Sequence, residues 1–168
     1  MPPFPELWKL RAAAVTVYPM YRGVAKLCGM TSIEGAHSWQ EEIDLVREHW
    51  DEFDFFFVHY KYTDSAGEDG DFARKVKAIQ DFDAKVPELL ALGPNVLVIA
   101  GDHSTPAMMA DHSWHPVPTL IRGDHVRTDA VHRFNEPETL QGGLGIFPAK
   151  ELLPIAFAHA RRLARFGA

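Results

Sequence analysis

Short apolar runs that lack polar alternation recur along the chain and limit the folds that it can adopt. They are AAAVTVY (12–18), FDFFFVHY (53–60), NVLVIAG (95–101) and VPTLIRG (117–123). Runs of this length, rich in β-branched and aromatic residues, are typical of strands that are covered on both faces. Strands of this kind belong to sheets that carry helices on both sides.

Segments with helical periodicity separate these runs, over about 20–29, 38–50, 71–92 and 148–166. Ser38 and Asp71 stand where N-caps are expected. Pro87 is expected either to kink the long third segment or to mark its last turns, and Gly93 to end it. The alternation of strands and helices predicts a three-layer α/β/α fold with a largely parallel sheet. At 168 residues we expect a single domain over 1–168.

The apolar stripe of the long third segment is predicted to face the core. It consists of Phe72, Val76, Ile79, Phe82, Val86, Leu89 and Leu90.

Charge and cysteine content exclude several classes of protein. The net charge is −6 and the basic residues form no stripe, which argues against a nucleic-acid-binding surface. No apolar run approaches the ~18 residues of a membrane span, and the first residues lack the layout of a signal peptide. Cys28 is the only cysteine, so we expect no intrachain disulfide and a reducing, cytoplasmic setting.

Three polar segments lie beside the predicted strands: TDSAGEDGD (63–71), GDHSTP (101–106) and DHSWHPVP (111–118). The first two directly follow strands, and α/β sheets bind ligands beyond the carboxyl ends of their strands. The simpler reading of the first segment is a solvated turn. Because all three segments carry carboxylates or histidines, together they favour a metal site.

The residue types in these segments narrow the choice of metal. Asp64 and Glu68 are four residues apart and approach each other if the segment coils into a helix. Asp102 and His103 are adjacent, so both reach one site only if the chain turns there. Mixed carboxylate and imidazole ligands suit Mn²⁺, Zn²⁺ or Fe²⁺ better than Ca²⁺, and one cysteine excludes a thiolate site. His115 is either a ligand or a neighbour of one.

Three stretches carry a resemblance to a known family: HYKYTDSAGEDGDFARKVKAIQDFD (59–83), VLVIAGDHSTP (96–106) and HSWHPVPTLI (112–121). In order and spacing they resemble the archaeal-type cofactor-independent (2,3-bisphosphoglycerate-independent) phosphoglycerate mutases of the alkaline phosphatase superfamily. The resemblance covers nearly the whole chain. It implies an alkaline-phosphatase-like fold, of which this chain would be the carboxyl-terminal portion.

The same resemblance implies a site with two divalent metal ions. Asp64 and His112 would bind one ion with Glu68 as their partner, and Asp102 and His103 would bind the second. In much of the wider superfamily position 68 is histidine. A carboxylate there makes the site harder, which favours Mn²⁺, with Mg²⁺ or Zn²⁺ as alternatives.

The implied activity interconverts 3-phosphoglycerate and 2-phosphoglycerate through a phosphorylated serine or threonine. None of the five serines lies in the family's nucleophile motif: Ser32, Ser38, Ser65, Ser104 and Ser113. We therefore expect the nucleophile, the amino-terminal half and the lid of the family to be absent from this chain, and the isolated chain to be inactive.

Two other functions remain open. A phosphohydrolase of the same superfamily would need no nucleophilic serine, because the metals would activate water. A non-catalytic module would instead bind a separate amino-terminal chain, or a second copy of this one, through an apolar surface.

Overall fold

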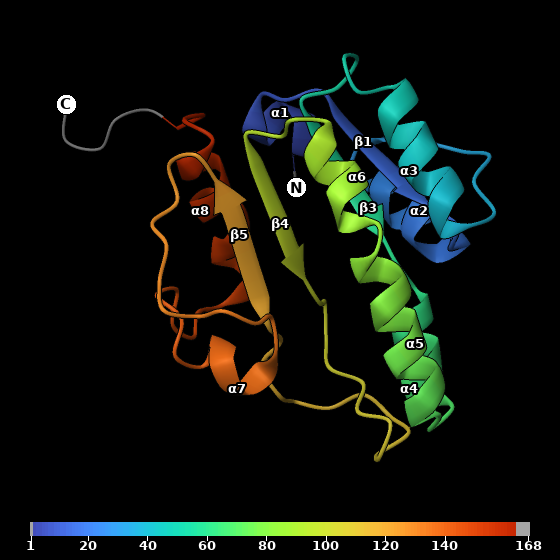
Figure 1. Ribbon diagram of the computed structural model, residues 1–168. Helices are drawn as coiled ribbons and strands as arrows, with labels where there is room; N and C mark the ends of the chain where they lie inside the picture. The colour runs from blue at the N-terminus through green and yellow to red at the C-terminus, as the bar shows by residue number, and fades with distance from the viewer. Residues whose placement is uncertain (1, 164–168) are drawn as a thin grey trace.

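The computed structural model describes residues 2–163 as strands flanked by helices (Figure 1). The strands are β1 (Ala12–Thr16), β2 (Thr31–Ile33), β3 (Phe55–His59), β4 (Val96–Ala100) and β5 (Thr119–Gly123). The helices are α1 (Phe4–Trp8), α2 (Pro19–Leu27), α3 (Trp39–Glu48), α4 (Tyr62–Glu68), α5 (Phe72–Asp83), α6 (Val86–Ala91), α7 (Glu136–Thr139) and α8 (Leu152–His159), with a 3-10 turn, η1 (Ala149–Glu151), before α8.

The strands form two sheets. β2, β1 and β3 are parallel, in that order, and β1 lies in the middle with partners on both edges. β4 and β5 form an antiparallel pair, with Ala100 opposite Thr119. The predicted α/β fold with a parallel sheet is confirmed. The antiparallel pair was not anticipated.

Helices cover both faces of the parallel sheet. The side chains of β3 point alternately to one face and the other, and so show what packs on each. Phe55 packs against Phe4 of α1 and Phe157 of α8, with ring centroids 5.0 and 6.1 Å away. Phe56, on the opposite face, stacks 5.5 Å from Trp50, directly after α3. The expected three layers are therefore present around β3.

Local sequence signals set the helix ends. The side chains of Ser38 and Asp71 accept hydrogen bonds from the backbone N–H groups of Glu41 and Arg74, so both predicted N-caps are confirmed. The long third segment breaks before Pro87 into α5 and α6, because proline is tolerated only in the first turn of a new helix.

Two predictions about burial are wrong. Phe72, Val76 and Ile79 of the α5 stripe are exposed, since α5 packs through Ala78 on an adjacent face. β4, expected to be buried, has no fully buried residue, because it has a strand partner only on the β5 side within residues 2–163.

Element boundaries also differ from expectation. The short strand β2 and helix α1 were not predicted, since three and five residues carry too little periodicity to detect. The terminal helix ends at His159, and positions 164–166 of that prediction lie outside the described residues. None of the helices in the described part is long and apolar enough to cross a membrane.

Candidate metal centre

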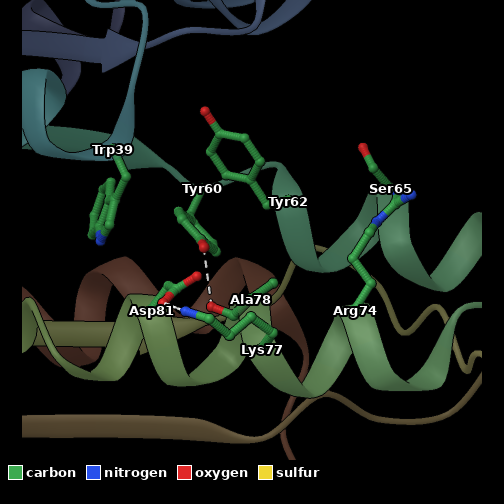
Figure 2. A pocket seen from close by; sticks show the side chains of 8 residues that line it. All are labelled: Trp39, Tyr60, Tyr62, Ser65, Arg74, Lys77, Ala78 and Asp81. Atoms are coloured by element: carbon green, nitrogen blue, oxygen red, sulfur yellow. Dashed lines mark hydrogen bonds and ion pairs between the residues drawn. The ribbon is translucent and has the colours of Figure 1, made fainter.

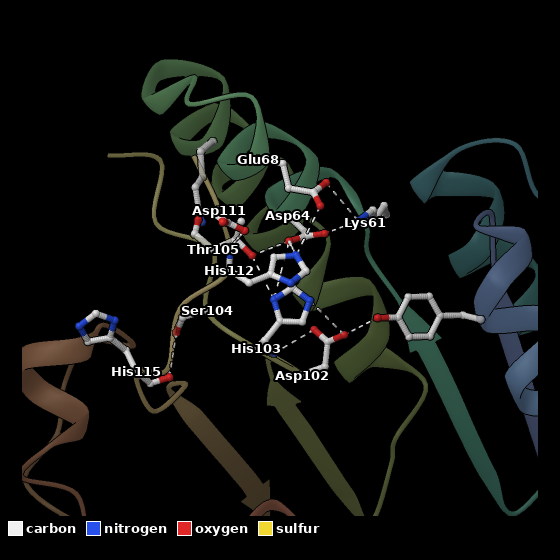
Figure 3. A network of polar contacts seen from close by, with 12 residues as sticks. Lys61, Asp64, Glu68, Asp102, His103, Ser104, Thr105, Asp111, His112 and His115 are labelled. Atoms are coloured by element: carbon white, nitrogen blue, oxygen red, sulfur yellow. Dashed lines mark hydrogen bonds and ion pairs between the residues drawn. The ribbon is translucent and has the colours of Figure 1, made fainter. Parts of the chain in front are cut away.

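The three polar segments meet at one end of the strands (Figure 3). β3 leads into α4, which carries Asp64 and Glu68, and β4 leads into Asp102 and His103. Because β5 runs antiparallel to β4, the segment before β5 returns to the end where β4 finishes. A bridge in which the N–H of Ser113 donates to the carbonyl oxygen of Ser104 (2.9 Å) fixes this return. The unpredicted antiparallel pair thus delivers the third segment to the site.

Asp64 is the centre of the cluster. Its Oδ1 lies 3.7 Å from Nε2 of His112 and 3.8 Å from Nδ1 of His103. Nε2 of His112 is also 3.4 Å from Oε1 of Glu68. Asp64 and Glu68 occupy consecutive turns of α4, so the segment that could have been a solvated turn is a short helix with both acids on one side.

Asp102 and His103 complete the cluster. Nε2 of His103 is 3.7 Å from Oδ2 of Asp102, and the rings of His103 and His112 are 3.9 Å apart between centroids. The five predicted ligands therefore come together.

Small residues in the acidic motif allow α4 to lie against the loop after β4. A Cβ added to Gly67 would lie 2.3 Å from the carbonyl oxygen of Thr105, so any residue larger than glycine would clash there. Ala66 is fully buried. The buried hydroxyl of Thr105 donates to Oδ1 of Asp64 and lies 3.1 Å from Nδ1 of His103. This hydroxyl joins the two ligand segments.

Lys61, one helical turn before Asp64, was not anticipated from the sequence. Its ammonium group donates to Asp64 and lies 3.6 Å from Glu68. Burial opposes ionisation of Asp64, but the hydrogen bonds from Lys61 and Thr105 outweigh it and lower the pKa of this carboxyl. Asp64 is therefore ionised at neutral pH, as a metal ligand must be.

Asp102 has a similar partner in Tyr21 of α2, whose hydroxyl donates to Oδ2. Desolvation would raise the pKa of Asp102, but the hydrogen bonds from Tyr21 and the backbone, together with the nearby imidazoles of His103 and His59, outweigh it, so the pKa is lowered. No sequence signal links these residues, which are 81 positions apart.

The donor set fits a divalent metal ion. Ligand atoms of Asp64, His103 and His112 all lie within 4.8 Å of one another, so small side-chain movements bring them onto one ion. Carboxylate and imidazole together suit Mn²⁺, Zn²⁺ and Fe²⁺. Two more donors, Glu68 and Asp102, flank this trio on either side.

His115 and the nearby serines stay outside the cluster (Figure 3). Nδ1 of His115 is 2.9 Å from the hydroxyl of Ser113, and the hydroxyl of Ser104 donates to the His115 carbonyl oxygen at 3.2 Å. Ser65 lines the cavity described next. Among residues 2–163 no serine hydroxyl therefore bonds to one of the five predicted ligands.

A cavity of about 380 Å³ lies on the other side of α4 (Figure 2). Its lining is aromatic and charged: Trp39, Tyr60, Tyr62, Ser65, Arg74, Lys77, Ala78 and Asp81. Its two cations are already neutralised, because Arg74 pairs with Asp69 at 2.7 Å and Lys77 pairs with Asp81. The cavity is a surface recess apart from the ligand cluster.

The family model described as the metalloenzyme superfamily matches residues 1–158. The chain belongs to this metalloenzyme superfamily. Membership implies a divalent metal and agrees with the donor set that converges on Asp64.

Curated relatives match the whole chain. A protein from Thermotoga neapolitana, named "Probable 2,3-bisphosphoglycerate-independent phosphoglycerate mutase", is 52% identical over 168 residues, which are 100% of this chain and 42% of the relative. A Thermus thermophilus protein with the same name is 47% identical over 99% of this chain and 43% of its own length. The chain thus spans less than half the length of these relatives and corresponds to their carboxyl-terminal part.

Solved structures show the same fold. A protein from Pyrococcus horikoshii superposes with a TM-score of 0.91 at 36% identity, over 99% of this chain and 46% of that protein. The cofactor-independent phosphoglycerate mutase of Thermoplasma acidophilum superposes with a TM-score of 0.74 at 23% identity, over 95% and 39% of the two chains. The second match supports the fold alone. The expected alkaline-phosphatase-like architecture is confirmed.

Proposed function

We propose that this chain carries the metal-binding part of a cofactor-independent phosphoglycerate mutase, which interconverts 3-phosphoglycerate and 2-phosphoglycerate. The observation that carries the proposal is the convergence of three sequence segments on Asp64, with histidine nitrogens 3.7 and 3.8 Å from its Oδ1. The names of the full-length relatives supply the reaction.

The ligands divide into two groups around two ions. Asp64, Glu68 and His112 form the first group, and Asp102 with His103 forms the second. His103 faces both groups, because its Nδ1 points toward Asp64 and its Nε2 toward Asp102. The carboxylate at position 68 favours Mn²⁺ over softer ions.

The proposed reaction has two half-steps. A serine oxygen forms a bond to phosphorus, having lost its proton, while the bond from phosphorus to the 3-oxygen of glycerate breaks and that oxygen gains a proton. The second half-step reverses this on the 2-oxygen. Bound divalent ions would orient the phosphate and neutralise charge on the attacking and leaving oxygens. No serine hydroxyl of residues 2–163 bonds to the predicted ligands, and the Thr105 hydroxyl, which does, is buried and donates its proton to Asp64. We therefore assign the nucleophile to the part of the relatives that this chain does not match.

The first experiment measures Mn²⁺ binding to the chain by titration calorimetry. We expect His112→Gln to weaken binding at least 10-fold, since it removes a ligand of the first group. His115→Gln is the matched control, because His115 lies in the same segment but outside the cluster, and it should bind as the unmodified chain does. Equal binding by both variants would contradict the assignment of His112.

The second experiment tests the reaction. The chain alone should convert no 3-phosphoglycerate in a coupled assay. Adding the amino-terminal part of the Thermotoga neapolitana relative as a separate polypeptide should restore conversion. Robust activity of the chain alone would refute the proposed division of labour. Release of inorganic phosphate from small phosphate esters, abolished by His103→Ala, would instead favour the phosphohydrolase.

A second candidate function, docking of a separate amino-terminal chain, is favoured by the open strand edges. Within residues 2–163, β3 pairs only with β1 and β4 only with β5, although both are apolar five-residue strands without proline or lysine. Edges of this kind are usually protected by a further strand or cover. Gel filtration of the chain mixed with the amino-terminal part of the relative should show a stoichiometric complex, and separate elution would exclude this function.

A further inference from the structure

The contact between Tyr21 and Asp102 joins two elements that are remote in sequence. Tyr21 lies in the first turn of α2, beside the parallel sheet, whereas Asp102 follows β4 of the antiparallel pair. The Tyr21 hydroxyl donates to Oδ2 of Asp102. This is a neutral donor on a carboxylate, a type of hydrogen bond that is stronger than one between neutral groups.

The ring of Tyr21 is held in place by its surroundings. It stacks on His59, with centroids 3.8 Å apart and an interplanar angle of 27°, and lies 6.3 Å from Phe57. Nδ1 of His59 is buried without a hydrogen-bond partner among the described residues, so this imidazole serves as a packing surface. The phenol therefore approaches Asp102 from a fixed direction.

Asp102 is restrained at both oxygens. Oδ1 accepts the backbone N–H of His103 at 3.1 Å, and Oδ2 accepts the hydroxyl of Tyr21. Each carboxylate oxygen retains a second lone pair, and Oδ2 faces Nε2 of His103 at 3.7 Å. The carboxylate is thus oriented with free lone pairs beside the imidazole.

We propose that Tyr21 is a positioning residue that orients Asp102 for an ion shared with His103. The inference rests on the proposed two-ion site, and adds a residue that is not itself a ligand. Hydrogen-bond partners of metal ligands fix the orientation of those ligands, and their removal typically weakens metal binding about 10- to 100-fold. Tyr21 plays for Asp102 the part that Thr105 plays for Asp64 and His103.

The test compares Tyr21→Phe with Tyr18→Phe. Both substitutions remove one hydroxyl from the start of α2, and the rings lie 6.0 Å apart, but no hydrogen bond of the Tyr18 hydroxyl occurs in the described part of the chain. In Mn²⁺ titrations, Tyr21→Phe should weaken one of two binding events about 10- to 100-fold and leave the other unchanged. Tyr18→Phe should change neither event.

A spectroscopic signal separates positioning from a general loss of structure. Metal binding at Asp102 redistributes its negative charge and perturbs the hydrogen-bonded phenol, so the unmodified chain and Tyr18→Phe should show an ultraviolet difference band of tyrosine on adding Mn²⁺. Tyr21→Phe should lack this band while keeping the circular dichroism of the unmodified chain.

Two results would overturn the inference in different ways. Unchanged or tighter binding by Tyr21→Phe, with normal binding by the unmodified chain, would mean that the hydroxyl merely occupies or competes for Asp102. The proposed function would survive that result. Absence of Mn²⁺ binding by the unmodified chain would overturn the two-ion site, and the role of Tyr21 with it.

Discussion

β1 and β4 are both five-residue apolar strands, yet one is buried and the other is not. Every residue of β1 is at most 3% exposed, whereas β4 has no fully buried residue. Composition does not explain the difference, because AAAVT is less hydrophobic than VLVIA. The difference in burial comes from the neighbouring strands. β1 is paired on both edges, while β4 is paired with β5 alone in the described residues.

The candidate metal centre lies where these two regions meet. Asp64 and Glu68 extend from the parallel sheet, and Asp102, His103 and His112 from the antiparallel pair. An ion bound across this boundary would stabilise the folded chain by mass action and tie the two regions together. We expect the closed region around β1 and the open region around β4 to respond differently to substitution.

The largest expected effect is a difference in stability between two isoleucine-to-alanine variants, one in each region. Ile43 of α3 is fully buried, so Ile43→Ala should lower the free energy of unfolding by about 3–4 kcal/mol through lost burial and a cavity. Ile99 of β4 is half-buried, so Ile99→Ala should lower the free energy of unfolding by only roughly 1 kcal/mol. Urea unfolding of both variants checks this. Equal losses would mean that β4 is as well packed as the closed region.

The next effect concerns the closed region alone. Glu42 is fully buried, and burial raises its pKa from 4.5 to about 7, although the N–H of Val17 donates to it and opposes the shift. Because the folded pKa is raised, the folded chain binds more protons between these values. Stability should therefore fall as pH rises from about 4.5 through 7, by about 3 kcal/mol at 1.36 kcal/mol per pKa unit.

Glu42→Gln should remove this pH dependence. At pH 8 the variant should be more stable than the unmodified chain by roughly 2–3 kcal/mol, and near pH 5 the difference should shrink to less than about 1 kcal/mol. Urea unfolding between pH 5 and 8 measures it. Glu48→Gln, an exposed substitution on the same helix, is the control and should run parallel to the unmodified chain. If the difference in stability between Glu42→Gln and the unmodified chain does not change with pH, water reaches Glu42 in the folded chain.

A smaller effect tests the junction between the two regions. Gly67→Ala would place a Cβ 2.3 Å from the carbonyl oxygen of Thr105 and push α4 away from the loop after β4. We expect this substitution to lower the free energy of unfolding by about 1–3 kcal/mol and to weaken Mn²⁺ binding. Nothing lies within 4 Å of the new Cβ in Gly23→Ala of α2, so this substitution should instead raise the free energy of unfolding by about 0.5–1 kcal/mol. Tight Mn²⁺ binding by Gly67→Ala would show that the junction tolerates a shift.

The sequence predicted which candidate ligands lie together better than it predicted the groups that hold them. Asp64, Glu68, Asp102, His103 and His112 stand in short motifs at strand ends, where local order along the chain and family resemblance are both informative. The hydroxyl and ammonium groups that hold the acids come from elsewhere: Tyr21 is 81 positions from Asp102 and Thr105 is 41 positions from Asp64. Contacts at such separations depend on the assembled fold.

The same reasoning explains the errors in the fold. Caps such as Ser38 and Asp71 depend on hydrogen bonds three residues away, and both were predicted correctly. Burial depends on what packs from outside the segment, so the stripe of Phe72, Val76 and Ile79 was recognised as apolar but wrongly placed in the core. The antiparallel direction of β5 likewise depends on its partner and leaves no mark in its own residues.

The smallest effect compares these two caps. Replacing an N-cap by alanine costs a helix about 1 kcal/mol, and in α3, which covers the closed region, Ser38→Ala should lower the global free energy of unfolding by that amount. α5 carries an exposed face that includes Phe72 and Ile79, so it can open without unfolding the rest. Asp71→Ala should therefore change global unfolding by less than about 0.5 kcal/mol and instead speed hydrogen exchange of the α5 amides. A global loss equal to that of Ser38→Ala would mean that α5 unfolds only with the whole chain.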